Sequence, residues 1–401
     1  MLELGPILSA LSRNRVAAIL VMLQIAITLA VVANAAFIIE QRLEKMSRPT
    51  GIDSDNVFFV QSYGFAPGYD ALAVIRSDLD EIRALPGVVA ASALSSIPLS
   101  GGGSQSTYQI TPGEDAPTVE GNYFEIDEYG IEALGVPLVA GRNFRADEVQ
   151  TDQGVTSKFV PAVIVTRDFA RDLFGDEPAV GRQVYDGLGQ AATVVGVIEN
   201  MQGSWVNATR LTSVLLHPRL PTPPIARYVV RAQPGQRDAL IAEVEHLLAS
   251  NRDRVVTWVR PHDWFLDRSY KPDLRMVVFL GVLIVWMLLL TGLGVVGLAS
   301  FLVRVRTRQI GTRRAVGATR GAILRYFLVE NWLLTTAGAV LGILLAFAFG
   351  HWLSNEYALP RLAPHYVALG VLALWILGQL AVLVPARRAA AISPAIATRT
   401  V

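Results

Sequence analysis

Length, composition and charge exclude an ordinary soluble protein. The chain has 401 residues, of which 52% are hydrophobic and 17% are charged, whereas about a quarter of the residues of a soluble domain are charged. One soluble core rarely holds so long a chain, so the surplus apolar residues are expected in a membrane. The net charge of +1 hides a segregation: residues 1–15, 304–325 and 387–401 hold 12 arginines and one acid, while residues 40–275 hold 22 basic and 31 acidic residues.

The composition also argues against a nucleic-acid-binding protein and against cysteine chemistry. Short basic stretches beside apolar runs, together with a large acidic segment, are not typical of a nucleic-acid-binding protein. The chain has no cysteine, which removes disulfides, thiol catalysis and cysteine-based metal sites.

Four segments are long and apolar enough to cross a bilayer, namely residues 16–39, 276–303, 326–350 and 366–386. Each contains an uncharged run of at least 20 residues, the length that a helix needs to cross about 30 Å of hydrocarbon. A cleaved signal peptide is the alternative for the first segment, but its apolar run is longer than the core of such peptides. We therefore expect one helix, a long polar segment and three more helices.

The arginines predict the orientation of these helices. Seven arginines and no acid lie in residues 304–325, whereas one arginine lies in residues 351–365. Because basic residues prefer the cytoplasmic side, the segments 1–15, 304–325 and 387–401 are expected to be cytoplasmic. Residues 40–275 and the short loop 351–365 are then outside.

Few polar residues interrupt the apolar runs. None of the runs contains a charged residue, which disfavours an ion-coupled transporter. Gln24, Asn34 and Gln379 are the polar exceptions, and we expect them to form interhelical hydrogen bonds. A stripe of small residues that recur every four positions predicts close helix packing in the third span. The stripe consists of Gly338, Gly342, Ala346 and Gly350.

The outer segment, residues 40–275, predicts an α+β domain with two lobes. Strand and helix patterns occur in the same order at its two ends, at 56–61, 71–84 and 88–94 and again at 227–231, 237–249 and 255–260. These two units are expected to form one lobe, with residues from about 119 to 214 inserted as another. Loops are expected at 100–106 and 221–224. Helix through 40–48 and 263–275 would form a stalk, in which Pro49 ends the first helix and Pro272 kinks or starts the second.

No motif in the chain predicts chemistry of its own. The sequence lacks a G-x-x-x-x-G-K-[ST] phosphate loop and a G-x-S-x-G elbow, and its five histidines show no metal-ligand spacing. Residues 99–105, LSGGGSQ, superficially resemble the motif of ABC ATPases but are interpreted as a serine- and glycine-rich turn. We expect no catalytic site, no cofactor and no metal in this chain.

Residues 306–320, RTRQIGTRRAVGATR, are the most informative stretch. They closely resemble the cytoplasmic loop of FtsX-like, MacB-type ABC permeases, in which a pattern like R-x-x-E-I-G-x-x-R-A-[LV]-G-A-[ST] precedes a short helix. Gln309 stands where an acid is common. The tail 385–399, PARRAAAISPAIATR, is similar to the terminal element of that family, and residues 141–144, 163–181 and 194–198 are similar to its periplasmic core domain.

The resemblance implies an α-helical membrane protein with four transmembrane helices and a large α+β extracytoplasmic domain inserted between helices 1 and 2. It implies a permease subunit in a bacterial inner membrane, with both termini cytoplasmic and the large domain periplasmic. MacB carries a fused ATPase, whereas this chain begins almost at its first span. A separate ABC ATPase is therefore expected to hold ATP and Mg²⁺, and a second permease subunit is expected to complete a homo- or heterodimer.

The resemblance also implies that the arginine-rich loop is a coupling helix that docks on the ATPase. The docking residues would be Arg308, Gln309, Ile310, Gly311, Arg313, Arg314, Ala315, Val316, Gly317, Ala318, Thr319 and Arg320. Among them, Arg308, Arg313, Arg314 and Arg320 are candidates for charged contacts, and Ile310 and Val316 for an apolar knob. Attraction to lipid headgroups is the alternative use of the arginines. Glu330 is expected either to pair with a loop arginine or to be a simple interfacial carboxylate.

The function implied is mechanotransmission: ATP-driven motion of the periplasmic domain that drives efflux of a peptide, drug or other small molecule. A periplasmic adaptor and an outer-membrane exit duct would be further partners. Two alternatives remain open, namely an FtsX-like signalling module that activates cell-wall hydrolases and a lipoprotein-releasing permease. The sequence does not name the cargo.

Overall fold

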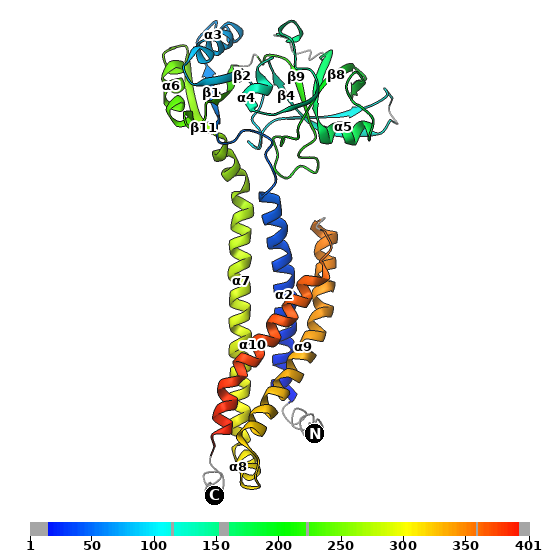
Figure 1. Cartoon of the computed structure of the whole chain (residues 1–401), viewed down its shortest axis with the longest axis vertical. Coiled ribbons are helices and arrows are strands. Elements are labelled where there is room, and N and C mark those ends of the chain that lie inside the picture. Colours follow the sequence, from blue (N-terminus) through cyan, green and yellow to red (C-terminus); the bar gives the residue numbers. More distant parts are fainter. Residues whose placement is uncertain (1–14, 114–115, 152–159, 222–223, 358–359, 393–401) are drawn as a thin grey trace. The chain divides into compact units, whose positions relative to one another are not determined.

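The computed structural model describes residues 15–113, 116–151, 160–221, 224–357 and 360–392 (Figure 1). The chain divides into two compact units. Residues up to 47 and from 272 onward form the helical unit, and residues 48–271 form the α/β unit. Most of the N-terminal segment 1–15, the middle of the expected loop 221–224 and the tail beyond residue 392, with Arg399, lie outside the described residues.

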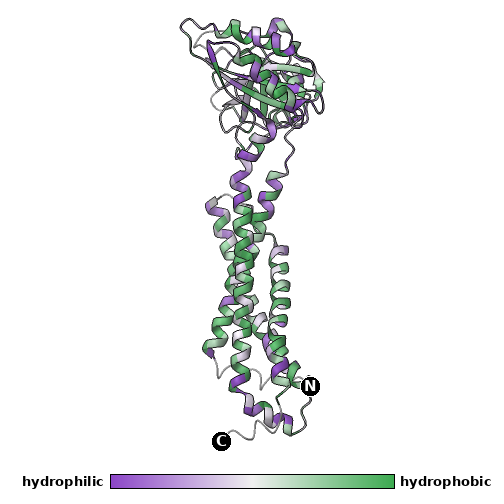
Figure 2. Cartoon of the chain, turned by 90° about the vertical axis from the view of Figure 1, so that its left-hand side faces the viewer, coloured by the Kyte–Doolittle hydropathy of each residue, from purple (hydrophilic) through white to green (hydrophobic). Residues whose placement is uncertain are grey.

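In the described part of the chain, four helices are long and apolar enough to cross a membrane. They are α2 (Arg15–Met46), α7 (His262–Val305), α9 (Arg320–Tyr357) and α10 (Pro364–Ala390), and each contains one expected span. Figure 2 shows that their middle portions are predominantly hydrophobic. Large apolar side chains such as Leu23, Leu344 and Leu380 are exposed on them, as lipid contact requires.

Helices α2 and α9 pack through the stripe of small residues. A Cβ atom added to Gly338 would lie 2.9 Å from the carbonyl oxygen of Met22, and one added to Gly342 would lie 2.9 Å from Leu29 Cβ. Ala346 is fully buried. The absence of larger side chains therefore lets the two backbones approach closely, which is how helices associate without a hydrophobic driving force in lipid.

The polar residues of the spans form interhelical hydrogen bonds, as the sequence predicts. Gln24 Nε2 donates to the Leu290 carbonyl at 2.8 Å, and Asn34 Nδ2 donates to the Ala346 carbonyl at 3.1 Å. Gln379 Nε2 donates to the Leu328 carbonyl at 3.3 Å. These bonds connect α2 to α7, α2 to α9 and α10 to α9.

An ion-pair cluster joins α2 and α7 beyond their apolar stretches. Arg42 Nη1 and Lys45 Nζ lie 2.6 and 2.8 Å from the two carboxylate oxygens of Asp273, whose side chain is only 5% exposed. Helix α7 begins at His262 and runs through Pro272, so of the two expectations for Pro272, a kink in the helix or its start, the start is wrong. The boundary between the two compact units nevertheless falls at this proline, where the helix lacks one backbone hydrogen bond.

In the α/β unit, one four-stranded antiparallel sheet has the order β11-β1-β10-β2. Its strands are β1 (Val57–Gly64), β2 (Val88–Ala93), β10 (Ile225–Ala232) and β11 (Arg254–Pro261). Phe58 and Val60 pack with α3 (Ala71–Ala84) and α6 (Arg237–Ala249) on one face. Val57 and Phe59 point to the other face, because side chains alternate along a strand.

A second sheet is inserted between β2 and β10. Its order is β5-β8-β6-β9-β4-β3-β7, and β7 also pairs with β8, which closes all of these strands except β5 into a ring. The strands are β3 (Ser104–Gln109), β4 (Thr118–Ile126), β5 (Leu138–Gly141), β6 (Ala162–Thr166), β7 (Gln183–Asp186), β8 (Ala191–Ile198) and β9 (Val214–Pro218). The remaining elements are the helices α4 (Gly130–Leu134) and α5 (Arg167–Phe174) and the short 3-10 turn η1 (Ala146–Glu148).

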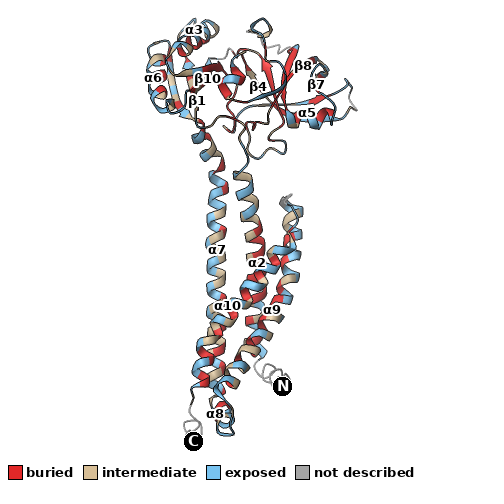
Figure 3. Cartoon of the chain, viewed as in Figure 1, coloured by how far each residue is buried: buried red, intermediate tan, exposed pale blue. Residues whose placement is uncertain are grey.

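The inserted sheet runs from residue 104 to 218 and is longer at both ends than the expected 119–214. Residues 104–106, expected in a loop, belong to β3 because they pair with β4. The two sheets share a core in which Phe59 and Val229 meet Phe124 and Ile164. Figure 3 shows this burial along the strands of both sheets.

A buried histidine makes the stability of the α/β unit depend on pH. His217 lies in β9 and stacks on Tyr123 with 4.9 Å between ring centroids. Burial, with a smaller contribution from Arg219, lowers the pKa of His217 from 6.5 to about 3. The unfolded chain therefore binds a proton before the folded one, and stability falls as the pH drops below 6.5 toward 3.

We predict that His217→Gln makes the protein less sensitive to acid. The titration of His217 alone should cost the wild type about 2 kcal/mol between pH 8 and pH 5. In thermal unfolding of the full chain, the fall in Tm between these pH values should be smaller in the variant by about 4–8 °C. His246→Gln, at an exposed position of α6, is the control and should behave as the wild type; equal behaviour of the two variants would contradict the prediction.

Candidate functional site

A short arginine-rich helix, α8 (Thr307–Ala315), lies between α7 and α9. A tight turn separates it from α9. Gly317 has a φ of +103°, which favours glycine, and the Ala318 amide donates to the Arg313 carbonyl at 3.0 Å. The Thr319 hydroxyl then accepts from the Ala322 amide at 3.1 Å and caps the start of α9.

The inner face of α8 is packed against the rest of the helical unit. Ile310 is 5% exposed, and Gly311 is buried. Ile310 belongs to a cluster with residues from α9 and α10, namely Ile323, Phe327, Ala386, Ala389 and Ala390. Arg314 Nη1 donates to the Ala390 carbonyl at 2.9 Å. The expectation that Ile310 forms an exposed knob is therefore wrong, because its own chain supplies the apolar surface that buries it.

A buried ion pair holds the beginning of α8. Arg306 Nη1 lies 2.9 Å from Glu330 Oε1 and 3.0 Å from Oε2. Arg306 is 8% exposed and Glu330 is 2% exposed. Glu330 therefore pairs with a loop arginine, which is the first of its two expected roles. Removing one partner of such a pair leaves a buried charge without compensation, so the pair fixes α8 to α9.

The outer face of α8 and its turn presents cations and one apolar tip. Arg308, Thr312 and Val316 recur every four residues and are all exposed, Val316 by 85%. The Arg313 guanidinium lies 5.2 Å from the centroid of the Tyr326 ring. The other exposed residues of the expected docking set are Gln309, Ala315, Gly317, Thr319 and Arg320, while Ala318 is half-buried.

This arrangement divides the docking set predicted from the sequence. Ile310, Gly311 and Arg314 hold the helix in place, and Ala318 packs against the same cluster. The exposed residues of the set can meet another molecule. The face suits an acidic surface with an apolar recess. Arg306 was missing from the predicted set, although its spacing of four residues from Ile310 places both on one face.

Two families match the chain. The FtsX-like permease C-terminal family matches residues 281–394, a range that contains α8 and its packing partners. The MacB-like periplasmic core domain family matches residues 18–247, which is more than half of the chain. This chain belongs to the MacB/FtsX-like ABC permeases. The resemblance seen in the sequence is thus confirmed, as is the fold class of four long apolar helices with an α+β periplasmic core domain between the first two.

Two curated relatives of this permease are longer than the chain. It is 28% identical over 272 residues to the macrolide export ATP-binding/permease protein MacB of Chromobacterium violaceum, covering 65% of this chain and 40% of the relative. It is 26% identical over 406 residues to a MacB protein of Yersinia pestis, covering 96% of this chain and 58% of the relative. The chain thus spans about half the length of the curated relatives it matches.

A solved structure also aligns with this permease. The periplasmic region of MacB from Actinobacillus actinomycetemcomitans covers 56% of this chain and 97% of that structure, with 15% identity and a TM-score of 0.35.

We predict that Glu330→Gln loosens α8. An uncompensated buried arginine should destabilise the docked helix by about 3–5 kcal/mol. Trypsin should then cleave the arginines of α8 at least ten-fold faster in the purified protein, as read by mass spectrometry of the fragments. Glu356→Gln changes an exposed residue of the same helix α9 and should leave the cleavage rate unchanged. Equal rates for the two variants would show that the ion pair does not hold α8.

Proposed function

We propose that this permease couples ATP hydrolysis by a separate ABC ATPase to motion of its periplasmic domain. The observation that carries the proposal is α8: its outer face offers arginines and Val316, while its inner face is anchored by Ile310 and the Arg306–Glu330 pair. An anchored helix transmits force, whereas arginines that only attract lipid need no such anchor. ATP and Mg²⁺ are held by the partner, since the 401-residue sequence has no phosphate loop.

The proposed topology places both termini and α8 in the cytoplasm and the α/β unit in the periplasm of a bacterial inner membrane. The seven arginines of residues 304–325 support this orientation, because the loop 351–365 at the other end of α9 has one.

The proposed relay follows contacts within the helical unit. Force on α8 reaches α9 and α10 through the cluster around Ile310. Helix α9 passes it to α2 at the small-residue stripe, where Gly342 meets Leu29. Helix α2 engages α7 through the Thr28–Thr291 hydrogen bond of 2.7 Å and, further along, through Asp273. Since α2 and α7 lead into residues 48 and 271 of the α/β unit, they would deliver the motion to it.

A second permease subunit would complete the transporter. In the most apolar stretch of α7 only 11% of the residues are buried, against 50% in α2. Val278, Val282, Val285 and Leu289 are exposed at spacings of four and three residues, the pattern of a helix that packs against another. This stripe is the face proposed to meet the second subunit.

The proposed output is efflux of a peptide, drug or other small molecule, with a periplasmic adaptor and an outer-membrane duct as further partners. The MacB relatives, which carry macrolide export in their names, support it. The match of residues 281–394 to the FtsX-like family supports the alternative, a signalling module that activates cell-wall hydrolases. A lipoprotein-releasing permease is a third variant.

We predict that Arg308→Glu and Val316→Glu disrupt the ATPase complex. The new carboxylates oppose an acidic partner surface and fill its apolar recess. The wild type should retain an ABC ATPase during affinity purification, and each variant should retain at least ten-fold less by quantitative mass spectrometry. Arg388→Glu, an exposed arginine of α10 outside α8, should retain it. Equal retention by all variants, or ATP hydrolysis by the purified chain alone, would overturn the coupling role.

We also predict that α7 cross-links two chains. Because the protein has no cysteine, Val285→Cys introduces a single thiol in the exposed stripe. Mild oxidation in membranes should convert at least half of this variant to a disulfide-linked dimer on non-reducing gels. Leu344→Cys, at an exposed position of α9, should remain monomeric. A dimer yield that is equal for the two variants would argue against α7 as the interface.

A further inference from the structure

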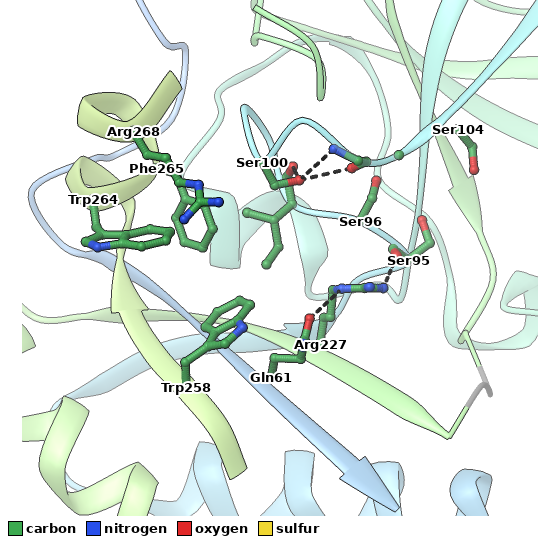
Figure 4. Close-up of a pocket in the computed structure, with 13 residues that line it drawn as sticks. Gln61, Ser95, Ser96, Ser100, Ser104, Arg227, Trp258, Trp264, Phe265 and Arg268 are labelled. Carbon is green, nitrogen blue, oxygen red and sulfur yellow. Dashed lines mark hydrogen bonds between the residues drawn. The ribbon is translucent and has the colours of Figure 1, made fainter. Parts of the chain in front are cut away.

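The α/β unit contains an open cavity of about 590 Å³ (Figure 4). It is lined by strands β1, β10 and β11, by the loop that follows β2 and by the first turns of α7. All of its lining residues lie within the single compact unit 48–271. The volume falls in the range of small-molecule sites, which are about 300–1,000 Å³.

The floor of the cavity is a row of three side chains on neighbouring strands. Gln61 of β1 is the register partner of Trp258 in β11 and of Arg227 in β10. Cross-strand partners point to the same face of a sheet. Arg227 Nε donates to Gln61 Oε1 at 3.2 Å, and its Nη1 donates to the Ser95 carbonyl at 2.8 Å (Figure 4).

Arg227 carries a charge that no carboxylate balances within the cavity. Both of its hydrogen-bond acceptors are neutral, and no aspartate or glutamate is found among the described residues that line the cavity. Burial lowers the pKa of Arg227, which is the electrostatic cost of a half-buried cation without a counter-ion. Arg268 adds a second guanidinium at the exposed rim. The cavity therefore favours an anion.

The wall formed by α7 is aromatic. Phe265 meets Trp258 and Trp264 edge to face, at 5.5 and 5.0 Å between ring centroids. The Arg268 guanidinium lies 5.2 Å from the centre of the Trp264 ring. Trp264 is exposed, and Trp258 is half-buried, so part of their ring surface is open to a ligand. Flat apolar groups stack well on such surfaces.

The opposite wall is the serine- and glycine-rich turn that the sequence analysis left without a role. The cavity is lined there by Ser96 before the turn, by Ser104 at the start of β3 and by Ser100 of the turn itself. Leu99 within it has a φ of 58°, a left-handed conformation that is costly for a leucine. The Leu99 amide donates to the Gly203 carbonyl at 3.0 Å, and the Ser269 hydroxyl donates to the Leu99 carbonyl. These bonds hold the turn in one shape, with its hydroxyls beside the cavity.

We propose that this cavity binds a small organic anion with a flat apolar body. The carboxylate, sulfonate or phosphate group of the ligand meets Arg227 and Arg268, and its ring system stacks on Trp258 and Trp264. This binding requires no ATPase, so it is independent of the coupling proposed above.

The test is equilibrium dialysis of the full chain in phosphatidylcholine nanodiscs against 2-naphthoate. We expect saturable binding of one molecule per chain and at least ten-fold weaker binding of the neutral 2-naphthamide. Arg227→Gln and Trp264→Ala should each weaken naphthoate binding at least ten-fold. Arg171→Gln removes an exposed arginine of α5 that does not line the cavity and should bind as the wild type.

Two further measurements keep the result decisive. Arg227→Lys retains the charge and should bind more tightly than Arg227→Gln, and the Tm of each variant shows whether it is folded. Decanoate distinguishes a lipid acyl chain from a flat ligand and should bind at least ten-fold more weakly than 2-naphthoate. Equal binding of naphthoate and naphthamide, equal binding by Arg227→Gln and Arg171→Gln, or tighter binding of decanoate would each overturn the proposal.

Discussion

The ion pair between Arg306 and Glu330 is the interaction on which the placement of α8 in this permease depends. It is almost fully buried, so each charge needs the other. With Arg306 fixed, the next turn of α8 buries Ile310 against α9 and α10. The outward direction of Arg308 and Val316 then follows from the helical repeat. One buried contact thus decides which residues of an arginine-rich stretch can reach a partner.

The membrane helices are joined in a way that suits transmission of force. Small residues bring α2 and α9 into backbone contact at Gly338 and Gly342, and hydrogen bonds connect α2 to α7 at Gln24 and Thr28. Such contacts are specific in position, unlike general apolar packing in lipid. The cluster around Asp273 repeats this connection beyond the apolar stretches. Displacement of one helix would therefore be shared by its neighbours.

Local signals predicted much of this structure. Helix α3 has the predicted bounds because Asp70 caps its start, where the Ala73 amide donates to it, and Pro86 follows its end. The spans and the small-residue stripe were visible because periodicity and length carry that information. The orientation of Ile310 could not be predicted, since the sequence alone does not show that α9 and α10 supply an apolar surface for it. The cavity was also invisible, because strand pairing brings Gln61 next to Arg227 from 166 residues away.

The insertion point of the second sheet has a consequence for how such permeases can diverge. The chain leaves the first sheet after Ala93 in β2 and returns in β10, where Tyr228 pairs with that same alanine. The points at which the chain leaves and re-enters the first sheet are therefore neighbours. The length of the segment between them adds little to the entropic cost of bringing its two ends together. The whole segment between β2 and β10 can therefore be exchanged, in evolution or by design, while the four-stranded sheet and the two connections to the helical unit are kept. The replacement must restore the shared core, where Phe124 and Ile164 lie against Phe59, and the hydrogen bonds that Gln202 donates to the Arg48 and Pro49 carbonyls.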